Sequence, residues 1–123
     1  MIVIKRIYSK SLSNDNAYFT ILVDRLWPRG IRKDQVRIDL WLRDIAPSHQ
    51  LRRWFGHDPA KWDEFKKRYF AELDSKEELV RVILDKAKNG PVCLLYGARD
   101  EKHNDAVALK ELLDLKLGMR LKH

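Results

Sequence analysis

Residues 24–30 place a carboxylate, two guanidinium groups and an indole within seven positions, and they are the part of this sequence best suited to bind a ligand. Arg25 and Arg29 flank Trp27, and guanidinium groups recognise phosphates and carboxylates in planar, two-pronged geometry. The proline and glycine of this segment indicate a rigid turn. Because ordinary turns consist of small polar residues, we expect a surface for an anionic ligand here. The alternative is that Trp27 fills a core and the arginines cover the end of a sheet.

A second segment with titratable side chains, residues 96–104, follows the last predicted strand and leads into the last predicted helix. Ligands of open parallel sheets bind outside the carboxyl ends of the strands. If the two segments lie side by side, they combine an anion clamp with acid and base groups, namely Asp24, Arg25, Arg29, Tyr96, Arg99, Asp100 and His103. The catalytic candidates are Asp100 and His103. The ligand-binding candidates are Arg25, Trp27, Arg29, Tyr96, Arg99 and Asn104.

Several of these polar residues also have a purely structural interpretation. Asp100 or Asn104 can cap the last helix, and Asp24 can pair with a neighbouring arginine. His103 can be an exposed polar residue at the start of that helix. Arg25 and Arg29 are stronger candidates than these, because packing alone does not explain two arginines around one tryptophan-proline pair.

Common catalytic and cofactor signatures are absent from the sequence. There is no Gly-x-x-x-x-Gly-Lys or Gly-x-Gly-x-x-Gly phosphate loop and no serine nucleophile elbow. His57-Asp58 and the pair Asp100 and His103 could supply metal ligands, but no His-x-x-x-His motif or cysteine pair accompanies them. We therefore expect no metal and no cofactor, and a hydrolytic step would use water as the nucleophile.

Three apolar runs predict the strands that position these segments: residues 2–8, 18–23 and 91–96. Their nearly continuous apolar character is typical of a sheet covered on both faces. A turn is expected at residues 14–16. Strands that alternate with helices favour parallel crossovers. We expect a single α/β domain over residues 1–123, with a short, mainly parallel sheet of three or four strands packed by helices in a Rossmann-like crossover.

The helices are predicted from caps and from apolar spacing. Residues 38–45 and 48–55 fit short helices, and Asp58-Pro59 is a strong start signal for a longer one. Ser75 and Glu78 fit a capping box for the next helix. The last helix is expected over residues 103–117, with Gly118 at its end. The buried stripe of the longer helix consists of Trp62, Phe65, Tyr69 and Leu73.

Length and charge limit the function classes. The chain has 123 residues, the size of one domain, and a net charge of +7. Residues 25–68 carry 12 Lys and Arg against 6 Asp and Glu, together with all four tryptophans. Basic and aromatic side chains suit a nucleotide or a polyanion, although a basic face can also be merely solvated. One cysteine excludes an intrachain disulfide, and without a membrane-spanning run or signal peptide we expect a cytoplasmic protein.

The sequence closely resembles the YeaO-like family, labelled domain of unknown function 488, over nearly its whole length. This resemblance implies a compact α/β domain and, by analogy of fold, remote similarity to hydrolases that process nucleosides or nucleic acids. It carries no catalytic residue over to this chain. The motifs behind it are residues 24–30, 39–42, 46–48, 51–59, Trp62, Phe65, Arg68-Tyr69, residues 95–100, His103-Asn104 and Ala106.

Three functions remain open at this stage. The first is an anion- or nucleotide-binding pocket, with hydrolysis of a nucleotide, nucleoside or nucleic acid as its activity. The second is a non-catalytic nucleic-acid-binding or regulatory module that uses residues 25–68. The third is a structural or interaction protein with an aromatic dimer face. The expected partner is a phosphate-bearing small molecule or a nucleic acid and not a membrane, with monomer and homodimer both open.

Overall fold

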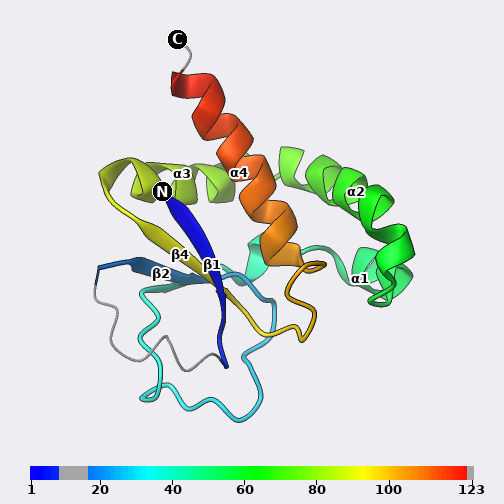
Figure 1. The fold of residues 1–123 in the computed structure, drawn as a ribbon, viewed down its shortest axis with the longest axis horizontal. Helices are drawn as coiled ribbons and strands as arrows, with labels where there is room; N and C mark the ends of the chain where they lie inside the picture. Colours follow the sequence, from blue (N-terminus) through cyan, green and yellow to red (C-terminus); the bar gives the residue numbers. More distant parts are fainter. Residues whose placement is uncertain (9–16, 122–123) are drawn as a thin grey trace.

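A computed structural model describes residues 1–8 and 17–121 of the chain. A four-stranded sheet lies at its centre, with strand order β1-β4-β2-β3 and every neighbouring pair parallel. Figure 1 shows the sheet beside the helices. The predicted α/β class and single short parallel sheet are confirmed, and the sheet is wholly parallel. The strands are β1 Ile2–Arg6, β2 Phe19–Leu22, β3 Leu40–Trp41 and β4 Val92–Tyr96.

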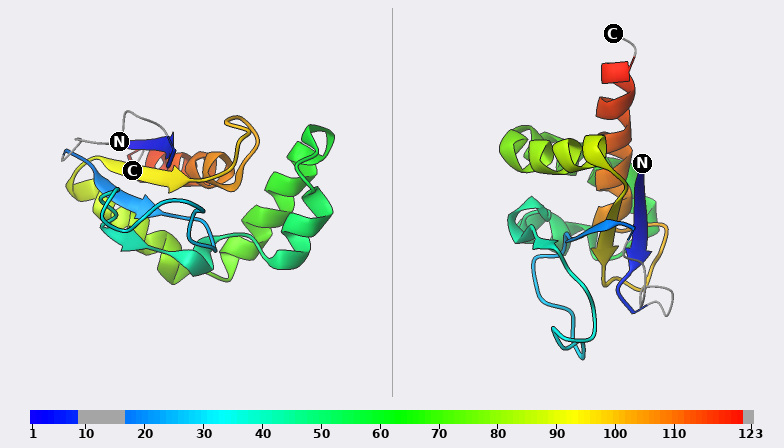
Figure 2. Two further views of the ribbon diagram at one scale, coloured as in Figure 1. Left: turned by 90° about the horizontal axis from the view of Figure 1, so that it is seen from below. Right: turned by 90° about the vertical axis from the view of Figure 1, so that its left-hand side faces the viewer.

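Side chains alternate between the two faces of the sheet, and each face has its own cover. On β4, Leu94 packs into the large core under the helices, whereas Cys93 and Leu95 point to a smaller cluster on the opposite face. The smaller cluster is covered by the loop between β2 and β3, which contributes Trp27 and Val36. Both faces are therefore buried, as the continuous apolar runs predict. Figure 2 shows the helices gathered on one side of the sheet.

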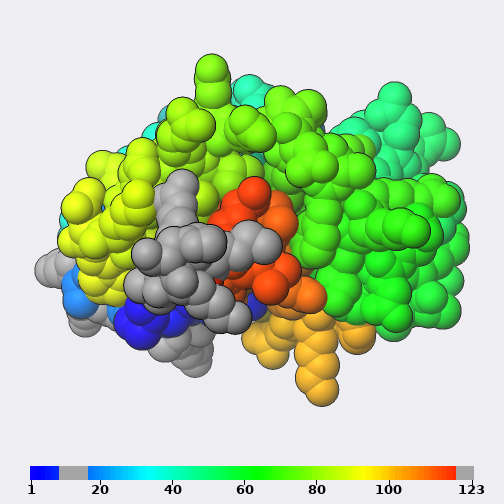
Figure 3. Space-filling model, turned by 90° about the horizontal axis from the view of Figure 1, so that it is seen from above, coloured from blue at the N-terminus to red at the C-terminus, as the bar shows by residue number. Residues whose placement is uncertain are grey.

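The helices pack against one another as well as against the sheet. Helix α4 contacts β1 and β4, and it lies between α3 and α2 in the space-filling view (Figure 3). Phe65, Tyr69 and Leu73 of α2 are buried, which confirms the predicted stripe, while Trp62 is partly buried against the same core. The helices are α1 His49–Phe55, α2 Trp62–Asp74, α3 Glu77–Asn89 and α4 Asp105–Leu121, with short 3-10 helices η2 Arg43–Ile45 and η3 Pro59–Lys61.

Three sequence predictions of local structure are wrong. Residues 38–45 form β3 and η2, because Leu40 and Trp41 pair with β2 at the edge of the sheet and tertiary pairing overrides helix propensity. The capping box is absent: Ser75 Oγ donates to the Glu72 carbonyl, and α3 starts after Lys76 without a side-chain cap. Helix α4 starts at Asp105 and passes through Gly118, whose cost inside a helix is only about 1 kcal/mol.

The predicted turn at residues 14–16 lies outside the described residues. Within the described part of the chain, no helix has both the length and the apolar character needed to cross a membrane.

Candidate functional site

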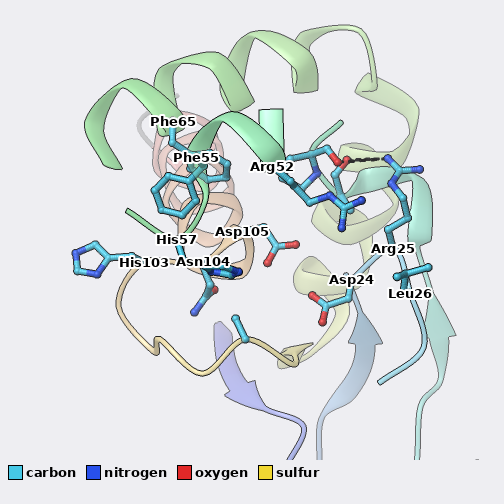
Figure 4. A pocket seen from close by; sticks show the side chains of 13 residues that line it. Asp24, Arg25, Leu26, Arg52, Phe55, His57, Phe65, His103, Asn104 and Asp105 are labelled. Carbon is cyan, nitrogen blue, oxygen red and sulfur yellow. Dashed lines mark hydrogen bonds between the residues drawn. The ribbon is translucent and has the colours of Figure 1, made fainter. Parts of the chain in front are cut away.

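A cavity of about 290 Å³ lies where the loop after β2, the junction between η2 and α1, and the start of α4 meet (Figure 4). The carboxyl ends of β2 and β4 both lead to it, which is where open parallel sheets bind their ligands. Apolar and charged side chains share its wall. The lining residues are Asp24, Arg25, Leu26, Ala46, Pro47, Arg52, Phe55, His57, Phe65, Ala98, His103, Asn104 and Asp105.

Two carboxyl groups face each other across this cavity. Asp24 follows β2, and its Oδ2 accepts a hydrogen bond of 2.7 Å from the backbone N–H of Gly97, just after β4. A side chain at Gly97 would crowd this contact, because a Cβ there would lie 3.2 Å from Asp24 Oδ2. Asp105, the first residue of α4, turns its carboxyl group toward Asp24 (Figure 4). The two strand ends and one helix start therefore bring the pair together.

Both carboxyl groups have raised pKa values. Burial raises the pKa of Asp24 to about 6, against the lowering effects of the Gly97 N–H and the positive charge of Arg52. Burial and then the negative charge of Asp24 raise the pKa of Asp105 to about 8. At neutral pH the two neighbouring groups together therefore carry about one proton and about one negative charge. The pocket thus offers a hydrogen-bond acceptor and a hydrogen-bond donor side by side.

Two arginines supply positive charge to the same cavity. Arg25 donates from Nη2 to the Ala46 carbonyl at 3.3 Å, and its Nη1 lies 3.7 Å from Asp44 Oδ1. Arg52 reaches the cavity from α1, and its charge lowers the pKa of both Asp24 and Asp105. The Nε atoms of both arginines are buried and have no hydrogen-bond partner among the described residues. Buried N–H groups normally have a partner, so neither guanidinium group is fully hydrogen-bonded within the described part of the protein, which suits a cavity that binds an anion.

Helix α2 fixes the wall that holds Arg25. The hydroxyl of Tyr69 donates to the Ile45 carbonyl at 2.7 Å. At the next residue, the Ala46 carbonyl also accepts from Lys76 Nζ at 3.0 Å. The carboxylate of Glu72 accepts from the backbone N–H of Ser48 at 2.8 Å and from its hydroxyl at 2.5 Å. These contacts set the start of α1 and hence the position of its side chains.

Three of the site residues predicted from sequence line the cavity: Arg25, His103 and Asn104. Asn104 is also the cap of α4, because its Oδ1 accepts from the Val107 N–H at 2.9 Å. Asp100 lies outside the lining residues and stabilises its own turn, where it accepts from the N–H groups of Lys102 and His103. Its Oδ2 also lies 2.9 Å from His103 Nδ1. The two catalytic candidates therefore form a pair, of which only the histidine reaches the cavity.

The remaining candidates lie elsewhere. Trp27 lies on the opposite face of the sheet, where its Nε1 donates to the Ile31 carbonyl at 2.6 Å and its ring packs against Trp41. Tyr96 is 3% exposed and belongs to the core under the helices. Arg29 and Arg99 are exposed and are not among the lining residues. Trp27 therefore fills a core, which is the alternative interpretation of residues 24–30.

Arg52 and Asp105 line the cavity, although neither is predicted from the sequence. Asp105 directly follows His103-Asn104, so extending the polar segment by one residue would have included it. Arg52 gives a weaker signal, because it lies on a short helix 27 residues after Arg25 in the chain. Among the described residues, no group of three or more His, Cys, Asp or Glu side chains could hold a metal ion.

Comparison with known proteins matches residues 1–121 to a protein family described as the inactive DUF488-N3 subclade. This chain belongs to that family. This chain is 38% identical to the uncharacterized protein YeaO of Escherichia coli K12 over 109 residues, which cover 89% of this chain and 93% of YeaO. It is 40% identical to the uncharacterized protein Rv3073c of Mycobacterium tuberculosis H37Rv over 96 residues, 76% of this chain and 79% of the relative. No solved structure matches the chain significantly.

Proposed function

We propose that the cavity binds a small phosphate-bearing ligand of the nucleotide class without turning it over. The observation that carries this proposal is the pair of guanidinium groups, Arg25 and Arg52, whose buried Nε atoms have no partner among the described residues. Arginine binds phosphate oxygens with strong, charge-assisted and often two-pronged hydrogen bonds. The word "inactive" in the family's description supports binding over catalysis. A cytoplasmic location, where free nucleotides occur, is part of the proposal.

Hydrolysis of a nucleotide, nucleoside or nucleic acid is the second candidate function. The observation that favours it is the carboxyl pair, whose pKa values of about 6 for Asp24 and about 8 for Asp105 lie on either side of neutrality. A protonated and an ionised carboxyl group in one pocket can act as general acid and general base. His103, held at Nδ1 by Asp100, would add a third group at the rim.

Calorimetric titration with inorganic phosphate and with AMP tests the proposed binding. We expect Arg52→Gln to weaken binding of both ligands by at least about tenfold, because it removes a charge-assisted hydrogen bond donor from the cavity. Arg53→Gln is the matched control, since Arg53 is the next residue of α1 and is exposed. Equal affinity of wild type and Arg52→Gln would overturn the assignment of this pocket as the phosphate site.

Chromatography of AMP, ATP and adenosine after incubation with the protein separates the two functions. Binding without product formation supports the first proposal. Product formation that Asp105→Asn abolishes while AMP still binds would instead establish hydrolysis as the function of the site.

A further inference from the structure

The two ends of the cavity have different chemistry. Figure 4 shows the guanidinium groups of Arg25 and Arg52 together on one side, and the carboxyl groups of Asp24 and Asp105 facing each other nearer the ends of the strands. Arginines recognise the phosphate of the proposed ligand but leave the carboxyl pair without a function. A part of the ligand that hydrogen-bonds to carboxyl groups would occupy that second end.

We propose that Asp24 and Asp105 bind neighbouring hydroxyl groups of a sugar, so that the ligand is a pentose phosphate, either free or as the sugar-phosphate part of a nucleotide. This inference rests on the proposed function, because the phosphate of the same ligand binds Arg25 and Arg52.

Hydrogen-bond capacity at the pair favours hydroxyl groups. Among the described residues, the Gly97 N–H is the donor to the Asp24 carboxylate, at Oδ2, which leaves Oδ1 as an acceptor. Asp105 Oδ1 accepts from the Ala106 N–H at 3.1 Å, and the backbone N–H of Asp105 also interacts with this carboxyl group. A carboxyl group has about four lone-pair sites, so capacity remains for a ligand. A hydroxyl group both donates and accepts, so it can donate to an ionised carboxylate and accept from a protonated one. Two adjacent hydroxyls satisfy both groups at once.

Charge disfavours a cationic ligand at the same place. Arg52 lies close enough to both carboxyl groups to lower their pKa values, and Arg25 lines the same cavity. An amine or a metal ion would approach two fixed positive charges to reach a pair that carries roughly one negative charge at neutral pH. Hydroxyl groups are neutral and meet no such repulsion.

The size of the cavity also fits a sugar phosphate. Its volume of about 290 Å³ lies just below the range of roughly 300–1,000 Å³ for drug-sized pockets, as a smaller ligand requires. The wall includes apolar side chains, among them Phe55 and Phe65, that can cover the carbon face of a sugar ring. A pentose with its phosphate fits this space, and the base of a nucleotide would lie at the opening.

Calorimetry with four probes tests the inference: inorganic phosphate, ribose 5-phosphate, AMP and 2′,3′-dideoxyadenosine monophosphate. We expect wild type to bind AMP at least about tenfold more tightly than its dideoxy analogue, because the analogue leaves the carboxyl pair unpaired. Similar affinities for AMP and ribose 5-phosphate identify a pentose phosphate as sufficient, and tighter AMP binding identifies a nucleotide. Recognition of the sugar hydroxyls is decided by the comparison of AMP with its dideoxy analogue.

Variants connect this preference to the two residues. Asp24→Asn and Asp105→Ala should each reduce the preference for AMP over the dideoxy analogue to less than about threefold, without weakening the binding of inorganic phosphate. Asp114→Asn, an exposed carboxylate on the same helix as Asp105, is the control and should keep the full preference. If a variant does not fold, the comparison of the two nucleotides in wild type still decides the question.

The outcomes separate this inference from the proposed function. Equal affinity of wild type for AMP and the dideoxy analogue, with phosphate still bound, would overturn hydroxyl recognition and leave the phosphate site intact. Failure of all four probes to bind would overturn both proposals.

Discussion

Asp24 and Asp105 occupy positions that destabilise the fold. Burial disfavours the charged form of a carboxyl group, and the nearby ionised Asp24 adds repulsion at Asp105. Gly97 leaves room for the Asp24 carboxylate, which its N–H binds. Sequences retain such unfavourable groups mainly at functional sites. The carboxyl pair is therefore as strong an argument for a binding site as the two arginines.

The raised pKa values predict how stability depends on pH. In the unfolded chain an aspartate has a pKa of about 3.9, so between about pH 4 and pH 8 the native state binds more protons at Asp24 and Asp105 than the unfolded state does. These two residues thus make the free energy of unfolding fall as pH rises through this range, and their effect levels off above about pH 8. Urea unfolding from pH 4.5 to 8.5 measures this dependence.

The contribution of the pair is isolated by comparing variants. The free energy of unfolding of Asp105→Asn should fall less steeply with pH than that of wild type. At pH 8.5 it should be higher than that of wild type by on the order of 2 kcal/mol, because a neutral amide replaces a buried charge. Asp114→Asn should follow wild type, since Asp114 is exposed. Parallel curves for wild type and Asp105→Asn would contradict the raised pKa of Asp105.

At the scale of elements, α2 determines where α1 begins. Ser48 is the N-cap of α1, and its Oγ accepts from the Leu51 N–H at 3.1 Å. The same serine donates twice to Glu72 of α2, from its backbone N–H and from its hydroxyl. Because Arg52 lies on α1, the contact between Ser48 and Glu72 connects the packing of two helices to the position of a pocket residue.

Loss of the Glu72 carboxylate should therefore affect both stability and binding. We expect Glu72→Ala to lower the free energy of unfolding by about 1–3 kcal/mol, because it leaves the Ser48 N–H without its charged acceptor. Amide hydrogen exchange within α1 should become faster, and AMP should bind more weakly. Glu64→Ala is the control on the same helix: Glu64 pairs with Arg68 at the surface, so its loss should cost less than about 0.5 kcal/mol. Similar losses in both variants would show that the contact between Ser48 and Glu72 does not determine the position of α1.

The elements also show why only part of the site could be predicted from sequence. Long apolar runs predict β2 and β4, and with them the strand ends that carry Arg25 and residues 96–104. That β2 and β4 are neighbours, so that these ends converge, is established by the structure. A strand as short as β3 depends on its partner β2, and its two residues carry no periodicity of their own. The position of Trp27 could not be predicted from sequence for the same reason, because its ring packs against Trp41 of β3. Arg52 depends on how α1 packs, which local patterns do not specify.

For the whole molecule, the net charge of +7 and the four tryptophans raise the question of nucleic-acid binding. Each indole has a cation of the protein nearby, as in Arg43 at 4.2 Å from the centre of the Trp41 ring and Arg68 at 4.0 Å from that of Trp54. Cation-π contacts and core packing therefore already use these rings. A nucleic acid would therefore bind through the exposed Lys and Arg side chains of residues 25–68 rather than by stacking on the indoles.

Salt dependence separates such a surface from the pocket. Affinity for a single-stranded oligonucleotide that contacts about four phosphates should fall roughly 50-fold between about 50 and 200 mM KCl, because bound counterions are released in proportion to the phosphates contacted. AMP engages one phosphate group and partly buried arginines, so its affinity should fall less than about fivefold. Fluorescence anisotropy with a labelled oligonucleotide and calorimetry with AMP measure the two slopes. Arg52→Gln should weaken the binding of AMP and leave the affinity for the oligonucleotide unchanged. The opposite result would make the cavity part of a nucleic-acid site: wild type does not bind AMP, and Arg52→Gln no longer binds the oligonucleotide.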